Sequence, residues 1–199
     1  LGFPFPHREW SDRRRPGWQS HKAVILGDYI LAKNMNIGLQ SVHFDLLTHV
    51  CGSMAALCEG EVLQDECAAN STMTRQAYLD IIYKKTASLL GVSASAGALA
   101  VGATRDRVAT MRRFGEAVGM AFQIQDDILD VVGDEATLGK PIGSDVRSDK
   151  TTFVALKGLA DCRILVAELT DRAVEALAPF GSEAESLRGL AQSLAGREK

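Results

Sequence analysis

The sequence predicts an all-α protein, and three observations support that fold class. Apolar residues recur every three or four positions along most of the chain, which is the period of a helix with one buried face. No stretch of useful length alternates apolar and polar residues as a half-buried strand does. Aromatic residues make up only 6% of the 199 residues. Alanine, leucine, valine and glycine are abundant, which favours helices packed through small side chains over a β-sandwich.

The periodic stretches define the expected elements. We expect helices over residues 18–39, 41–64, 75–84, 86–103, 105–132, 153–178 and 183–197. Residues 65–74 and 133–152 are expected to be loops, because both are polar and the second contains three glycines and a proline. Thr74 is suited to cap the helix at 75–84, and Pro179 and Gly181 separate the last two helices.

Each helix is supported by its own apolar series, except the fourth, which is supported by its lack of charge. The series are Ala23, Leu26, Ile30 and Ile37; Phe44, Leu47, Cys51 and Met54; Tyr78, Ile81 and Ile82; Val108, Met111, Phe114, Val118 and Phe122; Leu165, Leu169, Val174 and Leu177; and Leu187, Leu190 and Leu194. The stretch from Thr86 to Thr104 has no charged residue and nearly the length of a membrane span. Its hydroxyls and glycines make it only weakly hydrophobic, so we expect a buried helix of a soluble bundle and no transmembrane segment.

Bulk composition limits the classes of function. Hydrophobic residues are 46% and charged residues 24% of the chain, as in ordinary globular domains. The net charge of −3 gives no basic surface for nucleic acid, so we expect no nucleic-acid partner. None of the four cysteines forms a C-x-x-C pair, and we see no signal peptide. We therefore expect reduced thiols and a cytoplasmic protein.

The most unusual stretch is Gly119–Asp134, which is largely apolar but carries Asp126, Asp127 and Asp130. Burying an unpaired charge is costly, so these carboxylates are expected to hold something positive. On a helix Asp126 and Asp130 share a face, Asp127 lies on its flank, and Gln123 precedes Asp127 by one turn. Hard cations such as Mg²⁺ prefer oxygen ligands of this kind. The alternative is an acidic helix end that faces solvent.

Two groups of basic residues could bind a phosphate. Lys85 and Thr86 stand side by side at the edge of an apolar helix, where an ammonium and a hydroxyl suit a phosphate oxygen. Lys140 and Lys150 lie in the polar loop that follows the acidic stretch, and this loop could close over a metal-bound phosphate. For Lys85, an ordinary surface lysine is the alternative.

Three polar residues interrupt the apolar series near the end of the helix at 41–64. They are Glu59, Glu61 and Gln64 in E-G-E-V-L-Q. We interpret them as an exposed polar face.

From about Trp18 onward, several motifs in order resemble those of the trans-isoprenyl diphosphate synthase (polyprenyl synthetase) family. They are A-V-I-L-G-D-Y-I at 23–30, E-G-E-V-L-Q at 59–64, Y-K-K-T-A-S-L at 83–89, F-Q-I-Q-D-D-I-L-D at 122–130, G-D-E-A-T-L-G-K-P-I-G-S-D at 133–145 and K-T-T at 150–152. The resemblance implies an isoprenoid-synthase-type helical bundle, usually a homodimer. It also implies condensation of an allylic diphosphate with isopentenyl diphosphate, with Mg²⁺ as cofactor.

The resemblance also implies roles for individual residues. Asp126 would ligate Mg²⁺ directly, while Asp127 and Asp130 would complete the metal-binding motif. Asp126, Asp127 and Lys85 would be the catalytic residues. The substrate-binding residues would be Lys85, Lys140 and Lys150, which would hold the allylic diphosphate, and Thr86 and Gln123, which would position that substrate.

One family motif is missing. The family has a first D-D-x-x-D, followed by an arginine pair, upstream of the recognisable part, and residues 1–17 contain no such motif. We therefore expect an atypical segment at 1–17 and a partial helical domain at 18–199, incomplete at its N-terminus, with reduced or no activity. The alternatives are a non-catalytic partner subunit of a heteromeric synthase and a class I terpene cyclase. Product chain length stays open.

Overall fold

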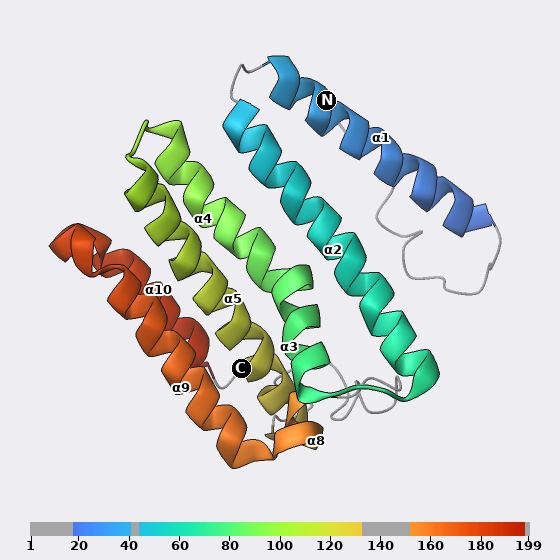
Figure 1. Cartoon of the computed structure of the whole chain (residues 1–199), viewed down its shortest axis with the longest axis vertical. Helices are drawn as coiled ribbons and strands as arrows, with labels where there is room; N and C mark the ends of the chain where they lie inside the picture. The colour runs from blue at the N-terminus through green and yellow to red at the C-terminus, as the bar shows by residue number, and fades with distance from the viewer. Residues whose placement is uncertain (1–17, 41–43, 133–151, 198–199) are drawn as a thin grey trace. The chain divides into compact units, whose positions relative to one another are not determined.

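The structure, a computed structural model, describes residues 18–40, 44–132 and 152–197 (Figure 1). These residues are almost entirely helical, and none of them forms a strand, which confirms the all-α prediction. The chain divides into two compact units, residues 1–47 and 48–199. The segment 1–17 that we predict to be atypical lies outside the described residues.

The first unit contains α1 (Trp18–Gln40) and the first turn of α2 (Phe44–Asn70). The two helices meet where a Cβ added to Gly38 would lie 2.6 Å from Leu47 Cδ1. The apolar series of α1 is largely at the surface, and Ile37, for example, is 64% exposed. Exposed apolar side chains in a group are typical of surfaces that pack against other elements or chains.

The second unit is built around α5 (Arg105–Val132), which lies between α4 (Ser88–Ala100) and α9 (Leu159–Ala176) (Figure 1). The chain then passes through a 3₁₀ helix at Ala178–Ala184 into α10 (Glu185–Ala195), which packs on both α9 and α5. Both faces of α5 are thereby covered, so the acidic motif belongs to a central helix.

Small residues allow α5 to pass close to α4 and to the segment Tyr83–Ala87 just before it. A Cβ added to Gly115 would lie 2.4 Å from the carbonyl oxygen of Leu90, and one added to Gly119 would lie 2.6 Å from Ala87 Cα. Neither distance leaves room for a side chain, because the neighbouring atoms belong to the backbone. Packing through small residues, as the composition indicated, therefore governs this crossing.

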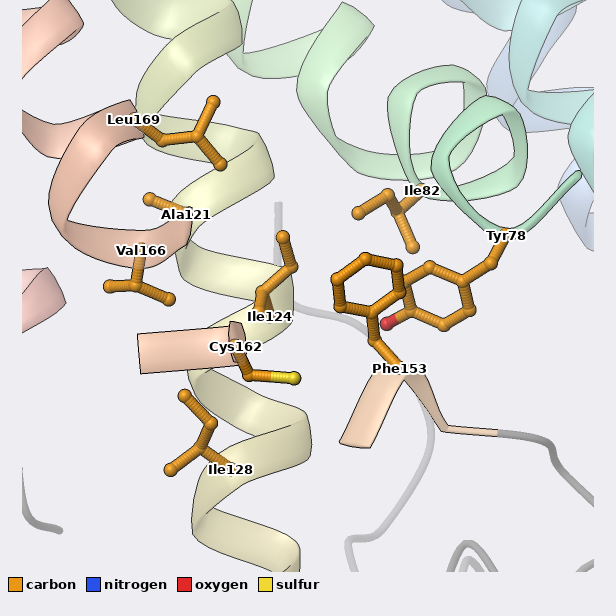
Figure 2. Close-up of a cluster of buried hydrophobic side chains, with 9 residues drawn as sticks. All are labelled: Tyr78, Ile82, Ala121, Ile124, Ile128, Phe153, Cys162, Val166 and Leu169. Atoms are coloured by element: carbon orange, nitrogen blue, oxygen red, sulfur yellow. The ribbon is translucent and has the colours of Figure 1, made fainter. Parts of the chain in front are cut away.

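Two clusters of buried apolar side chains line α5. The first joins its C-terminal half to α3 (Arg75–Ile82), α8 (Phe153–Lys157) and α9 (Figure 2). Its buried members are Tyr78, Ile82, Ala121, Ile124, Ile128, Phe153, Cys162, Val166 and Leu169. The second packs the N-terminal half of α5 against α9 and the chain that follows it. Its buried members are Phe114, Val118, Ala173, Leu177, Ala184 and Ala191.

The prediction of a helix at 41–64 followed by a loop at 65–74 is wrong at the C-terminal end of α2, because the helix continues to Asn70. The side-chain amide of Asn70 donates a hydrogen bond to the carbonyl of Glu66 at 2.9 Å, which satisfies one of the last carbonyls of the helix. Ser71 follows with a φ of 53°, a left-handed conformation that ends helices.

Two other helices differ from the prediction. The helix expected at 153–178 is divided at Gly158, whose φ of 83° is incompatible with a continuing helix. A π turn at Tyr83–Ala87, which we did not predict, lies between α3 and α4. The predicted N-cap is confirmed, since Thr74 Oγ1 accepts a hydrogen bond from the backbone amide of Ala77 at 3.1 Å.

One described helix, α2, is long and apolar enough to cross a membrane by length and composition alone. Core helices of soluble proteins pass the same test, so this is weak evidence for a span. The uncharged stretch at 86–103 does not meet that criterion. The expectation of no transmembrane segment stays a prediction.

Candidate active site

The acidic end of α5 holds its three carboxylates in different surroundings. Asp127 is 4% exposed and Asp130 is fully buried, whereas the side chain of Asp126 is 40% exposed. The neighbouring Ile124 and Ile128 lie in the first apolar cluster and fix which face of the helix turns inward. The three carboxylates therefore do not form one solvent-facing patch.

Asp127 is part of the packing between three helices. Its Oδ2 accepts a hydrogen bond from the hydroxyl of Tyr78 and another from the backbone amide of Phe153, both at 2.6 Å. The rings of these two partners stack, with centroids 5.0 Å apart (Figure 2). Because Tyr78 is on α3 and Phe153 begins α8, the carboxylate connects α3, α5 and α8. Spacing alone could not have predicted either partner, since they are distant in sequence.

Asp126 faces a cation that lies far along the chain. Its Oδ1 accepts a charged hydrogen bond from the guanidinium of Arg197. The guanidinium also lies 4.1 Å from the ring centroid of Phe122, and Gln125 Nε2 donates to the carbonyl of Arg197 at 2.9 Å. The carboxylate is thus accessible and already compensates a positive charge.

The predicted magnesium ligands Asp126, Asp127 and Asp130 remain a prediction. Within the described ranges no group of three or more carboxylate, histidine or cysteine side chains is arranged to hold a metal ion. Asp126 nevertheless suits Mg²⁺, which is commonly bound by one or two carboxylates together with waters and substrate phosphates. A guanidinium in contact with Asp126 shows that its surroundings accept a cation.

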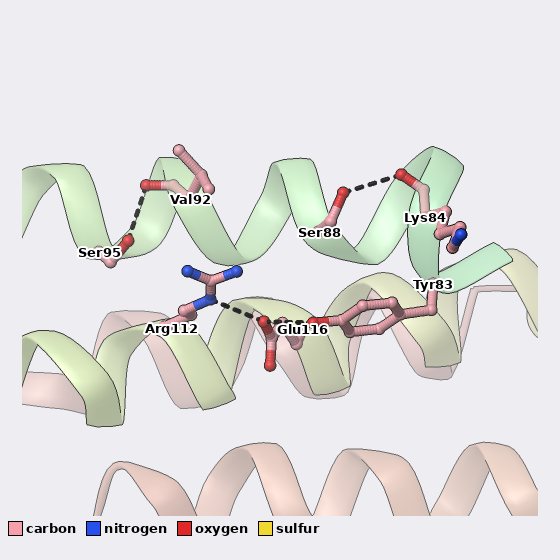
Figure 3. Close-up of polar contacts among 7 residues, drawn as sticks. All are labelled: Tyr83, Lys84, Ser88, Val92, Ser95, Arg112 and Glu116. Atoms are coloured by element: carbon pink, nitrogen blue, oxygen red, sulfur yellow. Dashed lines mark hydrogen bonds and ion pairs between the residues drawn. The ribbon is translucent and has the colours of Figure 1, made fainter. Parts of the chain in front are cut away.

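The π turn gives the Lys85 region its shape. The backbone amide of Ser88 donates to the carbonyl of Tyr83, one residue further back than in an α-helix. The carbonyl of Lys84 thereby loses its usual partner, and the hydroxyl of Ser88 replaces it with a hydrogen bond of 2.8 Å (Figure 3). π turns of this length occur frequently at functional sites.

A second contact holds the start of the π turn against α5. The hydroxyl of Tyr83 donates to Glu116 Oε1 at 3.0 Å, and Arg112 Nε donates to the same oxygen at 2.9 Å (Figure 3). Burial raises the pKa of Tyr83, and the hydrogen bond to Glu116 raises it further. Tyr83 therefore stays protonated and can act as the donor in this contact.

The predicted substrate-binding residues Thr86 and Lys85 point toward different helices. Thr86 Oγ1 donates to Gln123 Oε1 at 3.2 Å, so the structure brings these two residues together on the side of α5. Lys85 instead extends to α2, where its Nζ lies 2.8 Å from Glu61 Oε2. Their roles stay predictions, and Lys140 and Lys150 lie outside the described residues.

The contact between Thr86 and Gln123 relates the two predicted motifs. Gln123 lies on α5 one turn before Asp126 and Asp127. The hydroxyl next to Lys85 is therefore anchored close to the acidic end of α5, as a site for a metal-bound phosphate requires.

The chain as a whole matches the family model described as polyprenyl synthetase over residues 8–177. The chain belongs to the polyprenyl synthetase family. The match begins inside the segment 1–17 and continues to the end of α9, so it includes both the Lys85 region and the acidic end of α5.

Individual relatives agree with the family. The chain is 35% identical over 146 residues to the short chain isoprenyl diphosphate synthase of Methanothermobacter thermautotrophicus, which covers 71% of this chain and 45% of that protein. It is 36% identical over 154 residues to heptaprenyl diphosphate synthase component 2 of Geobacillus stearothermophilus, covering 75% and 47%. The chain thus spans about half the length of the curated relatives it matches.

The fold is shared with solved members of the polyprenyl synthetase family. A crystal structure of a polyprenyl synthase from Caulobacter crescentus CB15, complexed with calcium and isoprenyl diphosphate, matches with a TM-score of 0.82 at 26% identity. The match covers 92% of this chain and 68% of that one. The predicted isoprenoid-synthase-type helical fold is therefore confirmed.

Proposed function

We propose that this chain supplies the allylic-diphosphate side of a prenyltransferase, which condenses an allylic diphosphate with isopentenyl diphosphate into a longer polyprenyl diphosphate. The observation that carries the proposal is the hydrogen bond between Thr86 and Gln123. It anchors the lysine–threonine pair of the π turn one helical turn from Asp126 on α5. A cation-binding carboxylate and a phosphate-binding lysine are the two groups that a departing diphosphate needs.

Asp126 is the residue best suited to hold Mg²⁺. When bound, this ion stabilises the negative charge that develops on the departing diphosphate. The side chain of Asp126 is partly exposed and in contact with a guanidinium, whereas Asp127 and Asp130 are buried. The calcium and isoprenyl diphosphate named for the related Caulobacter structure support a divalent cation in this role.

The remaining roles follow the polar contacts of the π turn. Lys85 would donate to the diphosphate, while Thr86 and Gln123 would orient the allylic substrate. Lys140 and Lys150 are proposed to complete the diphosphate site. The apolar helices around these groups would exclude water, which protects a carbocation from being captured.

A dimer in the cytoplasm is the assembly and location that we propose. The exposed apolar side chains of α1 support a homodimer, because such surfaces usually pack against another chain. The four cysteines form no disulfide, which supports a reducing compartment. Burial raises the pKa of the Cys162 thiol and the charge of Asp127 raises it further, so this cysteine is held in its protonated form.

A second candidate is a non-catalytic partner subunit of a heteromeric synthase. One relative is named as a component of its synthase, which favours this candidate. This candidate predicts a stable complex with a complete synthase and no affinity for Mg²⁺-diphosphate. Size-exclusion chromatography with a complete synthase, together with calorimetric titration of the chain alone, separates the two candidates.

The proposed function is tested with the purified chain, geranyl diphosphate, radiolabelled isopentenyl diphosphate and Mg²⁺. We expect calorimetric binding of geranyl diphosphate that depends on Mg²⁺. Radiolabel from isopentenyl diphosphate is also expected in longer diphosphates. A chain that neither binds geranyl diphosphate nor forms product would contradict the proposal.

A further inference from the structure

The polar face near the end of α2 has no role in the function proposed above. Its members, Glu59, Glu61 and Gln64, were expected to be an exposed polar face. In the structure all three meet the π turn. Lys84 Nζ donates to Glu59 Oε2 at 2.7 Å, and Lys85 Nζ donates to Glu61 Oε2 and to Gln64 Oε1, both at 2.8 Å.

The two lysines are held differently. The Lys84–Glu59 pair is a single contact, and its side chains are 33% and 63% exposed, as in surface ion pairs that contribute little. The Lys85–Glu61 pair is similarly placed, with side chains 24% and 52% exposed, but Lys85 is held by two acceptors, one charged and one neutral. An ammonium has three N–H donors. With two of them directed to Glu61 and Gln64, the direction available to the third is restricted as well.

Gly60 allows this arrangement. A Cβ added to this buried glycine would lie 2.8 Å from Lys85 Cγ and 2.9 Å from Lys84 Cβ. The stems of both lysines therefore lie directly on the backbone of α2. This close approach brings Lys85 Nζ within reach of both Glu61 and Gln64, which stand on either side of the same helical turn.

We propose that Glu61 and Gln64 are positioning residues for Lys85, holding its ammonium so that the remaining N–H is directed at a bound diphosphate. The inference rests on the proposed function, because it assumes that Lys85 binds the diphosphate. Lysine has a long flexible side chain, and immobilising such a side chain on binding reduces affinity. Two acceptors that immobilise it in the free protein remove that cost before the ligand arrives.

The chain itself offers a matched control. Glu59→Ala and Glu61→Ala remove the same charge and the same atoms from the same helix, and each breaks one lysine contact. Because both substitutions remove one negative charge, they should change the long-range attraction of the diphosphate in the same direction and by a similar amount. If the contacts only attach α2 to the π turn, the two variants should therefore affect diphosphate binding alike. Gln64→Leu removes the neutral acceptor without any change in charge.

The experiment is calorimetric titration of the full chain with inorganic pyrophosphate in the presence of Mg²⁺. We expect Glu61→Ala to bind about three- to tenfold more weakly than Glu59→Ala, and Gln64→Leu to bind weaker than wild type by a similar factor. Glu61→Gln, which keeps an oxygen acceptor in place, should recover most of the affinity. In a Lys85→Ala background the Glu61 and Gln64 substitutions should have no further effect.

Two outcomes would overturn the inference while leaving the proposed function intact. One is equal binding by Glu61→Ala and Glu59→Ala alongside a clear loss in Lys85→Ala. The other is an undiminished Glu61 effect in the Lys85→Ala background. If wild type does not bind pyrophosphate, or if Lys85→Ala binds as well as wild type, the role of Lys85 in the proposed function fails and the inference fails with it.

Discussion

Asp126 and Asp127 are adjacent in sequence and occupy opposite environments on α5. Asp127 is buried and accepts hydrogen bonds from Tyr78 and from the backbone of Phe153. Asp126 is partly exposed and is in contact with a guanidinium from the last described residue, Arg197. Two identical side chains therefore have different roles. Asp127 holds packed helices together, and Asp126 faces a cation.

The difference shows that the carboxylates of the acidic motif are not equivalent. A buried carboxylate that accepts two hydrogen bonds stabilises the junction of three helices, because removing an acceptor from buried donors costs free energy. A half-exposed carboxylate contributes little to folding and is available for exchange of its cation. Stability should therefore depend on Asp127, and cation binding should depend on Asp126.

The largest effect on stability is expected for Asp127→Ala. The substitution removes the acceptor that the Tyr78 hydroxyl and the Phe153 amide share, and the loss of both buried hydrogen bonds costs about 3–5 kcal/mol of unfolding free energy. Urea denaturation followed by circular dichroism measures this loss. Asp126→Ala serves as the control and should lose less than about 1 kcal/mol. Equal losses in the two variants would remove the distinction between these carboxylates.

A smaller effect is expected for Tyr78→Phe. This substitution removes one of the two donors to Asp127 and keeps the aromatic ring that stacks on Phe153 at 5.0 Å. The amide of Phe153 still satisfies the carboxylate in part, so the expected loss is about 1–2 kcal/mol. The same denaturation measurement applies. A loss as large as that of Asp127→Ala would mean that the Tyr78 hydroxyl alone accounts for the stabilisation.

The smallest effect is expected for Arg197→Ala. The guanidinium contacts Asp126 and lies over the ring of Phe122, which together stabilise the fold by about 0.5–1 kcal/mol. Removing this cation leaves Asp126 open to a competing one. We therefore expect Mn²⁺ affinity, measured by electron paramagnetic resonance of the free ion, to rise about two- to fivefold. A fall in Mn²⁺ affinity would contradict competition at Asp126.

The helical part of the fold followed closely from sequence periodicity. The N-cap at Thr74 and the bounds of α5 were predicted correctly, because capping residues and apolar spacing act locally. The π turn at Tyr83–Ala87 was not predicted. It depends on Ser88 replacing a lost backbone hydrogen bond and on Tyr83 meeting Glu116 on another helix, and no local pattern reports either contact.

The individual residues of the candidate site could be predicted from the sequence, but their contacts with one another could not. Spacing placed Asp126, Asp127 and Asp130 at one end of a helix, and the family resemblance related them to Lys85 and Thr86. The different environments of the carboxylates could not be predicted, because they depend on residues far away in the sequence. Tyr78 and Phe153 lie 49 and 26 residues from Asp127, and Arg197 lies 71 residues from Asp126. Contacts over such separations are a property of the packed helices.

We propose that Asp126, the partly exposed carboxylate of the acidic motif, holds the cation that binds a diphosphate. Calorimetric titration of inorganic pyrophosphate, with and without Mg²⁺, tests it most directly in wild type, Asp126→Ala and Tyr78→Phe. We predict that Asp126→Ala loses the enhancement by Mg²⁺, a change of about tenfold or more, whereas Tyr78→Phe keeps it within about twofold. Full enhancement by Mg²⁺ in Asp126→Ala would contradict the claim.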